Sequence, residues 1–248
     1  PANLIVESVA ANQANYTTGA PMTINITIKN NSSSNISTAF KVGWTTNGVT
    51  QPACSALAGT SYSVGSLAAN TTKSDVVNTT APTTPGTYRV AAYVDGNCEI
   101  GETVEGTPGV TVNGDNFLPA TDTYTVSYPA PTCTPNPASV SYGQSSALAA
   151  SAGDGSSYLW SASPAGGTFS QTSGQNVSFS ATPAADTTYT ITVTSAGLTG
   201  TCSVTVIGFP APTCTATPGT VGSGQNSALS ASAGDGSSYL WSASPAGG

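Results

Sequence analysis

The chain contains no histidine, and only four of its 248 residues are lysine or arginine. Without histidine, a Ser-His-Asp or Cys-His catalytic site cannot be assembled, and the common histidine-containing zinc sites are excluded. Beyond Arg89 there is no basic residue, so the basic footprint of a protein that binds nucleic acid or anionic lipid is missing. No run of 18 apolar residues occurs, which predicts that no segment spans a membrane. The sequence therefore predicts a protein that is not an enzyme and binds no nucleic acid.

Charge is scarce as well, since charged residues make up only 6% of the chain and the net charge is −7. Valine, isoleucine, tyrosine and threonine nevertheless recur in short alternating runs, which disordered segments lack. Short runs of this kind, separated by Gly, Pro, Asn and Asp turns, are typical of β-sandwiches. The predicted fold is all-β, with tandem immunoglobulin-like β-sandwiches.

A repeat of period 81 organises the second half of the chain. Residues 131–167 and 212–248 are identical at 29 of 37 positions, and residues 151–167 are identical to residues 232–248. A fixed period indicates one structural unit that is used more than once. The second copy contains only the first half of the unit. The predicted domains are residues 1–129, 130–210 and 211–248.

Proline-rich joints connect these domains. The sequence YPAPTCT at residues 128–134 is nearly repeated as FPAPTCT at residues 209–215. Two prolines one residue apart favour a stiff, extended connection, so the domains are expected to form an elongated rod. The half repeat is expected to be completed by further polypeptide or by a strand of a neighbouring chain. In the second case the chains assemble head to tail into a fibre.

Alternating apolar residues mark the expected strands. The strands expected in the first domain are residues 3–9, 22–28, 38–46, 87–94 and 123–128, and those in the repeat are residues 138–142, 146–150, 176–180, 187–193 and 201–207. Each domain has one tryptophan in its presumed third strand, namely Trp44, Trp160 and Trp241. Each tryptophan is in phase with inward neighbours, which favours a core position over an exposed platform for sugars.

Five cysteines point to disulfides, since none forms a CxxC motif. Cys133 begins the full repeat and Cys202 lies near its end, so this pair is expected to join the first strand to the last. Cys54 and Cys98 are left for each other in the first domain. Cys214 is the equivalent of Cys133, so its partner is expected near position 283. Disulfides in small β domains predict an oxidising, extracellular compartment.

One acidic cluster follows the fourth expected strand of the first domain. Its members are Asp95, Glu99, Glu102, Glu105 and Asp115. Carboxylates at this density can hold Ca²⁺. A solvated acidic loop explains the same residues and is the favoured interpretation. We therefore expect no cofactor, with Ca²⁺ as the alternative.

Asn-x-Ser/Thr sequons, the acceptor motif for N-linked glycans, gather in the first domain. They lie at Asn15, Asn25, Asn30, Asn31, Asn35, Asn70, Asn78 and Asn176. Seven of the eight fall between residues 15 and 78. If the organism glycosylates asparagine, the first domain is expected to carry the sugars.

Three segments of the first domain carry a family resemblance. NLIVESV at residues 3–9, TINITIKN at residues 23–30 and the tail AAYVDGNCEIGETVEG…NGDNF…YTVSY resemble the CARDB domain, a cell-adhesion-related immunoglobulin-like module of bacteria and archaea. The resemblance covers roughly the first 128 residues. Family members follow a strand ending in V-D with an acidic turn, which Glu99, Glu102 and Glu105 would form here. The insertion TPGVTV at residues 107–112 departs from the family's spacing.

The repeat resembles the immunoglobulin-like or PKD-like modules of prokaryotic surface proteins. Together the resemblances imply a spacer, an adhesive stalk or a fibre subunit. The expected function is a non-enzymatic extracellular structural protein at the cell surface. Its expected partners are further copies of itself, arranged head to tail, or targets on cell surfaces and in the extracellular matrix. The alternatives are an accessory spacer of a large secreted enzyme and a carbohydrate-binding module.

Overall fold

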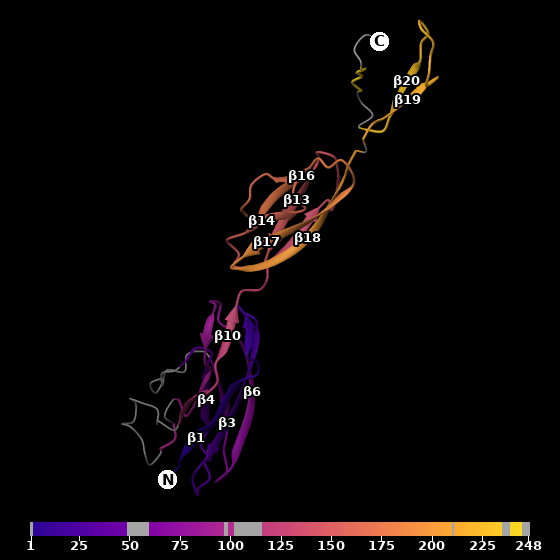
Figure 1. The fold of residues 1–248 in the computed structure, drawn as a ribbon. Helices are drawn as coiled ribbons and strands as arrows, with labels where there is room; N and C mark the ends of the chain where they lie inside the picture. The colour runs from indigo at the N-terminus through magenta and orange to yellow at the C-terminus, as the bar shows by residue number, and fades with distance from the viewer. Residues whose placement is uncertain are drawn as a thin grey trace. The chain divides into compact units, whose positions relative to one another are not determined.

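The computed structural model describes residues 2–48, 60–96, 99–101, 116–209, 211–234 and 239–244. The chain divides into two compact units, Pro1–Tyr128 and Pro129–Gly248. Within the described residues every regular element is a β-strand, and no helix there could cross a membrane (Figure 1). The prediction of an all-β, immunoglobulin-like chain is confirmed.

The described strands of the first unit form three sheets. Their strand orders are β1-β3-β6, β5-β4-β8-β9 and β2-β10-β7. Most neighbours are antiparallel, whereas β10 and β2 run parallel. The strands are β1 (Leu4–Ala11), β2 (Asn15–Thr17), β3 (Pro21–Asn30), β4 (Phe40–Thr45), β5 (Ser61–Val64), β6 (Thr72–Thr80), β7 (Gly86–Tyr88), β8 (Ala91–Val94), β9 (Phe117–Pro119) and β10 (Tyr124–Ser127).

The core of the first unit follows from the alternation in β3. Every second residue from Met22 to Ile28 is buried, because successive side chains of a strand point to opposite faces. These residues belong to one apolar cluster with Phe40 of β4 and Val94 of β8. Two sheets therefore share one core, as in a β-sandwich.

Residues 87–94, expected as one strand, form two strands in different sheets. β7 pairs with β10, whereas β8 pairs with β4 and β9. The chain changes sheets at Arg89 and Val90, which lie between the two strands. All four residues of β8 are buried, so this central strand lacks the alternation of a half-exposed one.

The second unit contains two four-stranded sheets and a hairpin (Figure 1). The sheet orders are β11-β13-β16-β15 and β12-β18-β17-β14, and β19 pairs with β20. The strands are β11 (Thr132–Asn136), β12 (Ser139–Ser141), β13 (Ser145–Ser151), β14 (Leu159–Ser163), β15 (Gly167–Phe169), β16 (Asn176–Ala181), β17 (Thr187–Ser195), β18 (Leu198–Ile207), β19 (Thr213–Thr217) and β20 (Ala228–Ser232).

The tryptophans of the two repeat copies differ in burial. Trp160 is buried in a cluster with Phe179, Ile191 and Val204, as the sequence predicted. Trp241 is exposed, so its predicted core position is wrong for the described part of the second copy. The reason is that Trp160 shares its apolar cluster with residues of β16, β17 and β18, and the described residues from 211 onward supply no such strands.

Candidate functional site

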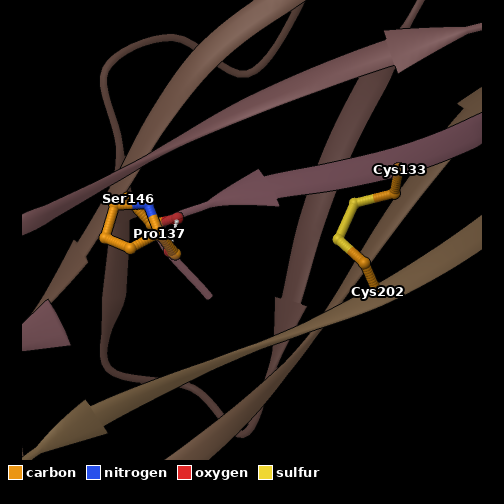
Figure 2. The surroundings of a disulfide bond; sticks show 4 residues. All are labelled: Cys133, Pro137, Ser146 and Cys202. Atoms are coloured by element: carbon orange, nitrogen blue, oxygen red, sulfur yellow. Dashed lines mark hydrogen bonds between the residues drawn. A yellow bond between two sulfur atoms is a disulfide. The ribbon is translucent and has the colours of Figure 1, made fainter. Parts of the chain in front are cut away.

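A disulfide joins Cys133 and Cys202 in the second unit (Figure 2). Cys133 lies on β11 of one sheet and Cys202 on β18 of the other, so the bond connects the two layers. The two Cα atoms are 5.4 Å apart, which is within the usual range for a disulfide. The cysteines are 69 residues apart in sequence, so the bond strongly constrains the unfolded chain. This pair is the one that the repeat phase predicted.

A buried serine holds the start of β13, in the same domain as this disulfide. Ser146 is fully buried, and its hydroxyl donates a 2.6 Å hydrogen bond to the carbonyl of Pro137 (Figure 2). Burying a hydroxyl costs free energy unless it is hydrogen-bonded. The second copy repeats the contact, since Ser227 donates to Pro218 at 2.6 Å. The contact therefore belongs to the hairpin itself.

The other three cysteines form no disulfide that the structure describes. Cys214 lies exposed on β19 with a free thiol. Its counterpart Cys133 is bonded to a residue of β18. Cys54 and Cys98 lie outside the described residues. Their pairing, and a partner for Cys214, stay predictions.

Asp154 ties the turn after β13 to the end of β17. Its carboxylate accepts hydrogen bonds from the hydroxyl and N–H of Ser157, from the N–H of Ser156 and from the hydroxyl of Ser195. These bonds, those from Ser157 foremost, hold the pKa of the Asp154 carboxyl well below its usual range. Gly153 has a φ of +65°, and a Cβ there would lie 2.3 Å from Ser195 Oγ, so the turn requires glycine.

Part of the acidic cluster in the first unit is described. Asp95 is buried, and its carboxylate accepts the N–H groups of Glu99 at 2.7 Å and Ile100 at 3.0 Å. These bonds close the turn after β8. The predicted ligands Glu102, Glu105 and Asp115 lie outside the described residues. Among the described residues, no three His, Cys, Asp or Glu side chains gather to hold a metal. The Ca²⁺ site stays a prediction.

The sequon asparagines divide into one buried and seven exposed residues. The exposed ones are Asn15, Asn25, Asn31, Asn35, Asn70, Asn78 and Asn176. Asn30 is fully buried at the end of β3. Its Nδ2 donates hydrogen bonds to the carbonyls of Ser34, Leu67 and Ala68, at 2.8 to 3.2 Å. The amide is therefore occupied and shielded, and its burial removes Asn30 from the candidate glycosylation sites of the folded domain.

A charged and aromatic cluster between β5 and β6 has no sequence motif of its own. Lys73 forms an ion pair with Asp75 at 2.5 Å, and its Nζ lies 5.7 Å from the ring centre of Tyr62. The ring of Trp44 lies 6.4 Å from that of Tyr62. Burial would raise the pKa of Asp75, but the hydrogen bond from Lys73 lowers it overall. The only available sequence signal was the Lys-x-Asp spacing, which places both charges on one face of a strand.

Comparison with protein families identifies a domain in the first unit. The CARDB family model matches residues 1–107. The resemblance to the CARDB domain that the sequence predicted is therefore confirmed over these residues. The match ends before residues 113–128, which the sequence resemblance had included. A comparison with curated proteins finds no match.

Three solved structures are among those to which the chain is similar. The CARDB domain of a Pyrococcus furiosus protein, in complex with di-metal ions, is 20% identical over 50% of this chain and 93% of that chain, with a TM-score of 0.37. The D0-D1 domain of intimin is 11% identical over 82% and 98% of the two chains, with a TM-score of 0.27. The Yersinia pseudotuberculosis adhesin InvE is 13% identical over 82% and 60%, with a TM-score of 0.33.

Proposed function

We propose that the chain is a non-enzymatic structural segment of an extracellular surface protein, used as an adhesin stalk or as a fibre subunit. The observation that carries the proposal is the Cys133–Cys202 disulfide in a domain that follows a CARDB domain. Disulfides persist in oxidising compartments and are rare in the cytosol. A crosslink between the two layers of a sandwich suits a domain that must stay folded outside the cell.

The acids of the second unit support a structural role. Asp154 is held by Ser156, Ser157 and Ser195, as described above. Asp186 accepts a 3.1 Å hydrogen bond from the N–H of Gly208. Acid–base hydrolysis of a glycoside needs two carboxylates that face each other across a cleft. Both described carboxylates of this unit instead fix loops.

We propose that the hairpin of the second copy takes part in assembly. In the first copy, β13 pairs with β11 on one side and with β16 on the other. In the second copy, β20 pairs with β19, and the described residues place no strand on its other edge. Four apolar residues that are exposed here have buried counterparts in the first copy. They are Val221, Leu229, Tyr239 and Trp241.

In the proposed fibre, a neighbouring copy adds a strand to the open edge of β20 and covers these apolar side chains. Addition of a strand to a sheet edge is a known mode of recognition. A contact between two different surfaces repeats from copy to copy, and it gives a filament when it does not close into a ring.

Location at the cell surface is the first test of the proposed function. Antibodies against the chain are expected to label intact cells, and a protease added outside the cells is expected to remove the label. A cytosolic reporter protein in the same cells serves as the control for lysis. Label found only after the cells are broken would contradict the proposal.

Self-association is the second test. Sedimentation of the purified chain is expected to show concentration-dependent polymers, and Leu229→Ser is expected to weaken them. Leu159→Ser is the matched control, because Leu159 is 60% exposed and Leu229 is 56% exposed, but Leu159 lies in the completed first copy. Equal weakening by both substitutions, or a chain that stays monomeric at every concentration, would contradict the fibre and leave the stalk.

A further inference from the structure

One large apolar side chain of the first unit is exposed to solvent. Among the described residues of this unit, Val76 is the sole large apolar side chain that is exposed, with 65% of its surface accessible. It lies in the middle of β6, whose only buried residue is Val77. Single exposed apolar residues are common on proteins. The neighbours of Val76 make this one informative.

Two exposed sequon asparagines flank Val76 on the same face of the sheet. Asn25 of β3 is paired directly with Val76 in the strand register. Directly opposite side chains of antiparallel strands have Cβ atoms about 5 Å apart. Asn78 lies two residues further along β6, so its side chain points to the same face. On its other side, Asn25 is paired with the exposed Ala10 of β1.

Among the described residues, β6 is also an edge strand. It pairs there with β3 alone in its sheet, and it is nine residues long. A long edge strand presents unpaired N–H and C=O groups that invite pairing with another chain. The ion pair of Lys73 and Asp75 protects one part of this edge. The part from Val76 to Thr80 carries no charged residue.

We propose that Asn25 and Asn78 carry N-linked glycans that cover Val76 and the uncharged part of the β6 edge. In the reaction, Nδ2 of asparagine bonds to the anomeric carbon of an oligosaccharide carried on a lipid pyrophosphate. The bond from that carbon to the pyrophosphate oxygen breaks, the lipid pyrophosphate leaves, and Nδ2 loses one proton. The apolar face of a pyranose ring then lies on Val76. The inference rests on the proposed extracellular location.

Asn30 is an internal control within the same domain. It has a complete sequon, but it is buried and its Nδ2 is hydrogen-bonded to three carbonyls. A transferase that acts on the folded domain cannot reach it. We therefore expect a glycan on an asparagine only where the side chain is exposed, even if the sequon is complete.

Glycopeptide mapping of the protein taken from the surface of its native cells tests the inference. Trypsin cuts after Lys29, Lys41, Lys73 and Arg89, so Asn78 is the only sequon on the peptide 74–89. Electron-transfer fragmentation then assigns each glycan to one asparagine. We expect glycan on Asn25 and Asn78 and none on Asn30. Recovery of peptide 74–89 at its unmodified mass alone would overturn the inference, while surface location would still support the proposed function.

Covering of Val76 is tested separately in the native host. The double variant Asn25→Gln/Asn78→Gln is expected to lose both glycans and to self-associate several-fold more than the native protein. Asn70→Gln is the matched control, because Asn70 is an exposed sequon residue in a turn outside the sheet. Adding Val76→Thr to the double variant is expected to reduce the excess self-association. Equal self-association of the double variant and the Asn70 variant would overturn the covering role.

Discussion

The two copies of the repeat have nearly the same sequence over the residues that they share, and the described residues of the two copies differ in what covers them. Trp160 is 5% exposed, and its counterpart Trp241 is 45% exposed. Leu148 is 1% exposed, and its counterpart Leu229 is 56% exposed. A side chain is therefore not a core residue by virtue of its sequence neighbourhood. It becomes one when strands from elsewhere in the chain pack against it.

The hairpin and the turn that follows it have the same geometry in both copies. The hydroxyl of Tyr158 donates to the carbonyl of Ala152 at 2.6 Å, and Tyr239 repeats this bond with Ala233. The two alanines have similar positive φ values, 62° and 65°. β19 and β20 also keep the register of β11 and β13. Turn and hairpin geometry thus depends on nearby residues, whereas burial depends on distant ones.

Replacement of each tryptophan by alanine should reveal the largest difference in stability between the two copies. Trp160→Ala removes a buried ring and its 2.8 Å hydrogen bond from Nε1 to the carbonyl of Gly174. We expect the free energy of unfolding to fall by roughly 3–5 kcal/mol. Trp241→Ala should change it by less than about 1 kcal/mol, because the ring is half exposed. Denaturant unfolding of both variants measures the difference. Equal losses would mean that the two copies do not differ in burial.

The disulfide gives the next largest contrast. The double variant Cys133→Ser/Cys202→Ser opens a crosslink between residues 69 apart in sequence. We expect it to lower the free energy of unfolding by about 2–4 kcal/mol, since the unfolded chain regains conformational freedom.

Cys214→Ser is the matched control for the disulfide, because its thiol is exposed and unbonded. Its stability should stay near that of the unaltered chain. Unfolding of the reduced and the oxidised protein at the same denaturant concentration would contradict the prediction that the disulfide stabilises the domain.

A smaller difference in stability is expected between variants of the corresponding tyrosines, Tyr158 and Tyr239. Tyr158→Phe leaves the carbonyl of Ala152 without the hydroxyl donor of a buried tyrosine, in a part-buried hydrogen bond. The expected loss of stability is roughly 0.5–1.5 kcal/mol. Tyr239→Phe removes the same bond where water can replace it, so the loss should be smaller. Thermal unfolding of the two variants side by side would refute the interpretation if Tyr239→Phe were the more damaging.

Acidification should affect the first copy through Asp154. Its hydrogen bonds from Ser157, Ser156 and Ser195 lower the pKa of the carboxyl in the folded state. Its contribution to stability is therefore complete above the unfolded pKa, which is about 3.9, and is lost as the pH falls below that value. We expect Asp154→Asn to flatten the loss of stability between pH 5 and pH 2. Urea unfolding across this range checks it, and parallel pH profiles for both proteins would speak against the interpretation.

The sequence predicted the strands that have one buried face and one solvent-exposed face. Alternation in residues 22–28 and 187–193 predicted β3 and β17, since every second side chain enters a core. β6 was missed because Val77 is its only buried residue. Residues 87–94 were misread because the chain changes sheets there, and both strands still contain β-forming residues.

The candidate sites could be predicted only where a pattern in the sequence itself marks the residues. Cys133 and Cys202 followed from the period of the repeat. The burial of Asn30 did not, because its hydrogen-bond partners at Leu67 and Ala68 are distant in sequence. The bond between Asp154 and Ser195 could not be predicted for the same reason, since its partners are 41 positions apart in the sequence.

Hydrogen exchange of β13 and β20 tests the central difference most directly. Residues 144–150 and 225–231 are corresponding segments with different masses, so pepsin peptides from the two strands can be told apart. In the dilute monomer, amides of β13 should exchange as slowly as those of β17, while amides of β20 should exchange many-fold faster, since an isolated hairpin is marginally stable in water. Assembly into polymers should slow β20 and leave β13 unchanged. Equal protection of both strands in the monomer would contradict the claim that distant strands, rather than local sequence, decide burial.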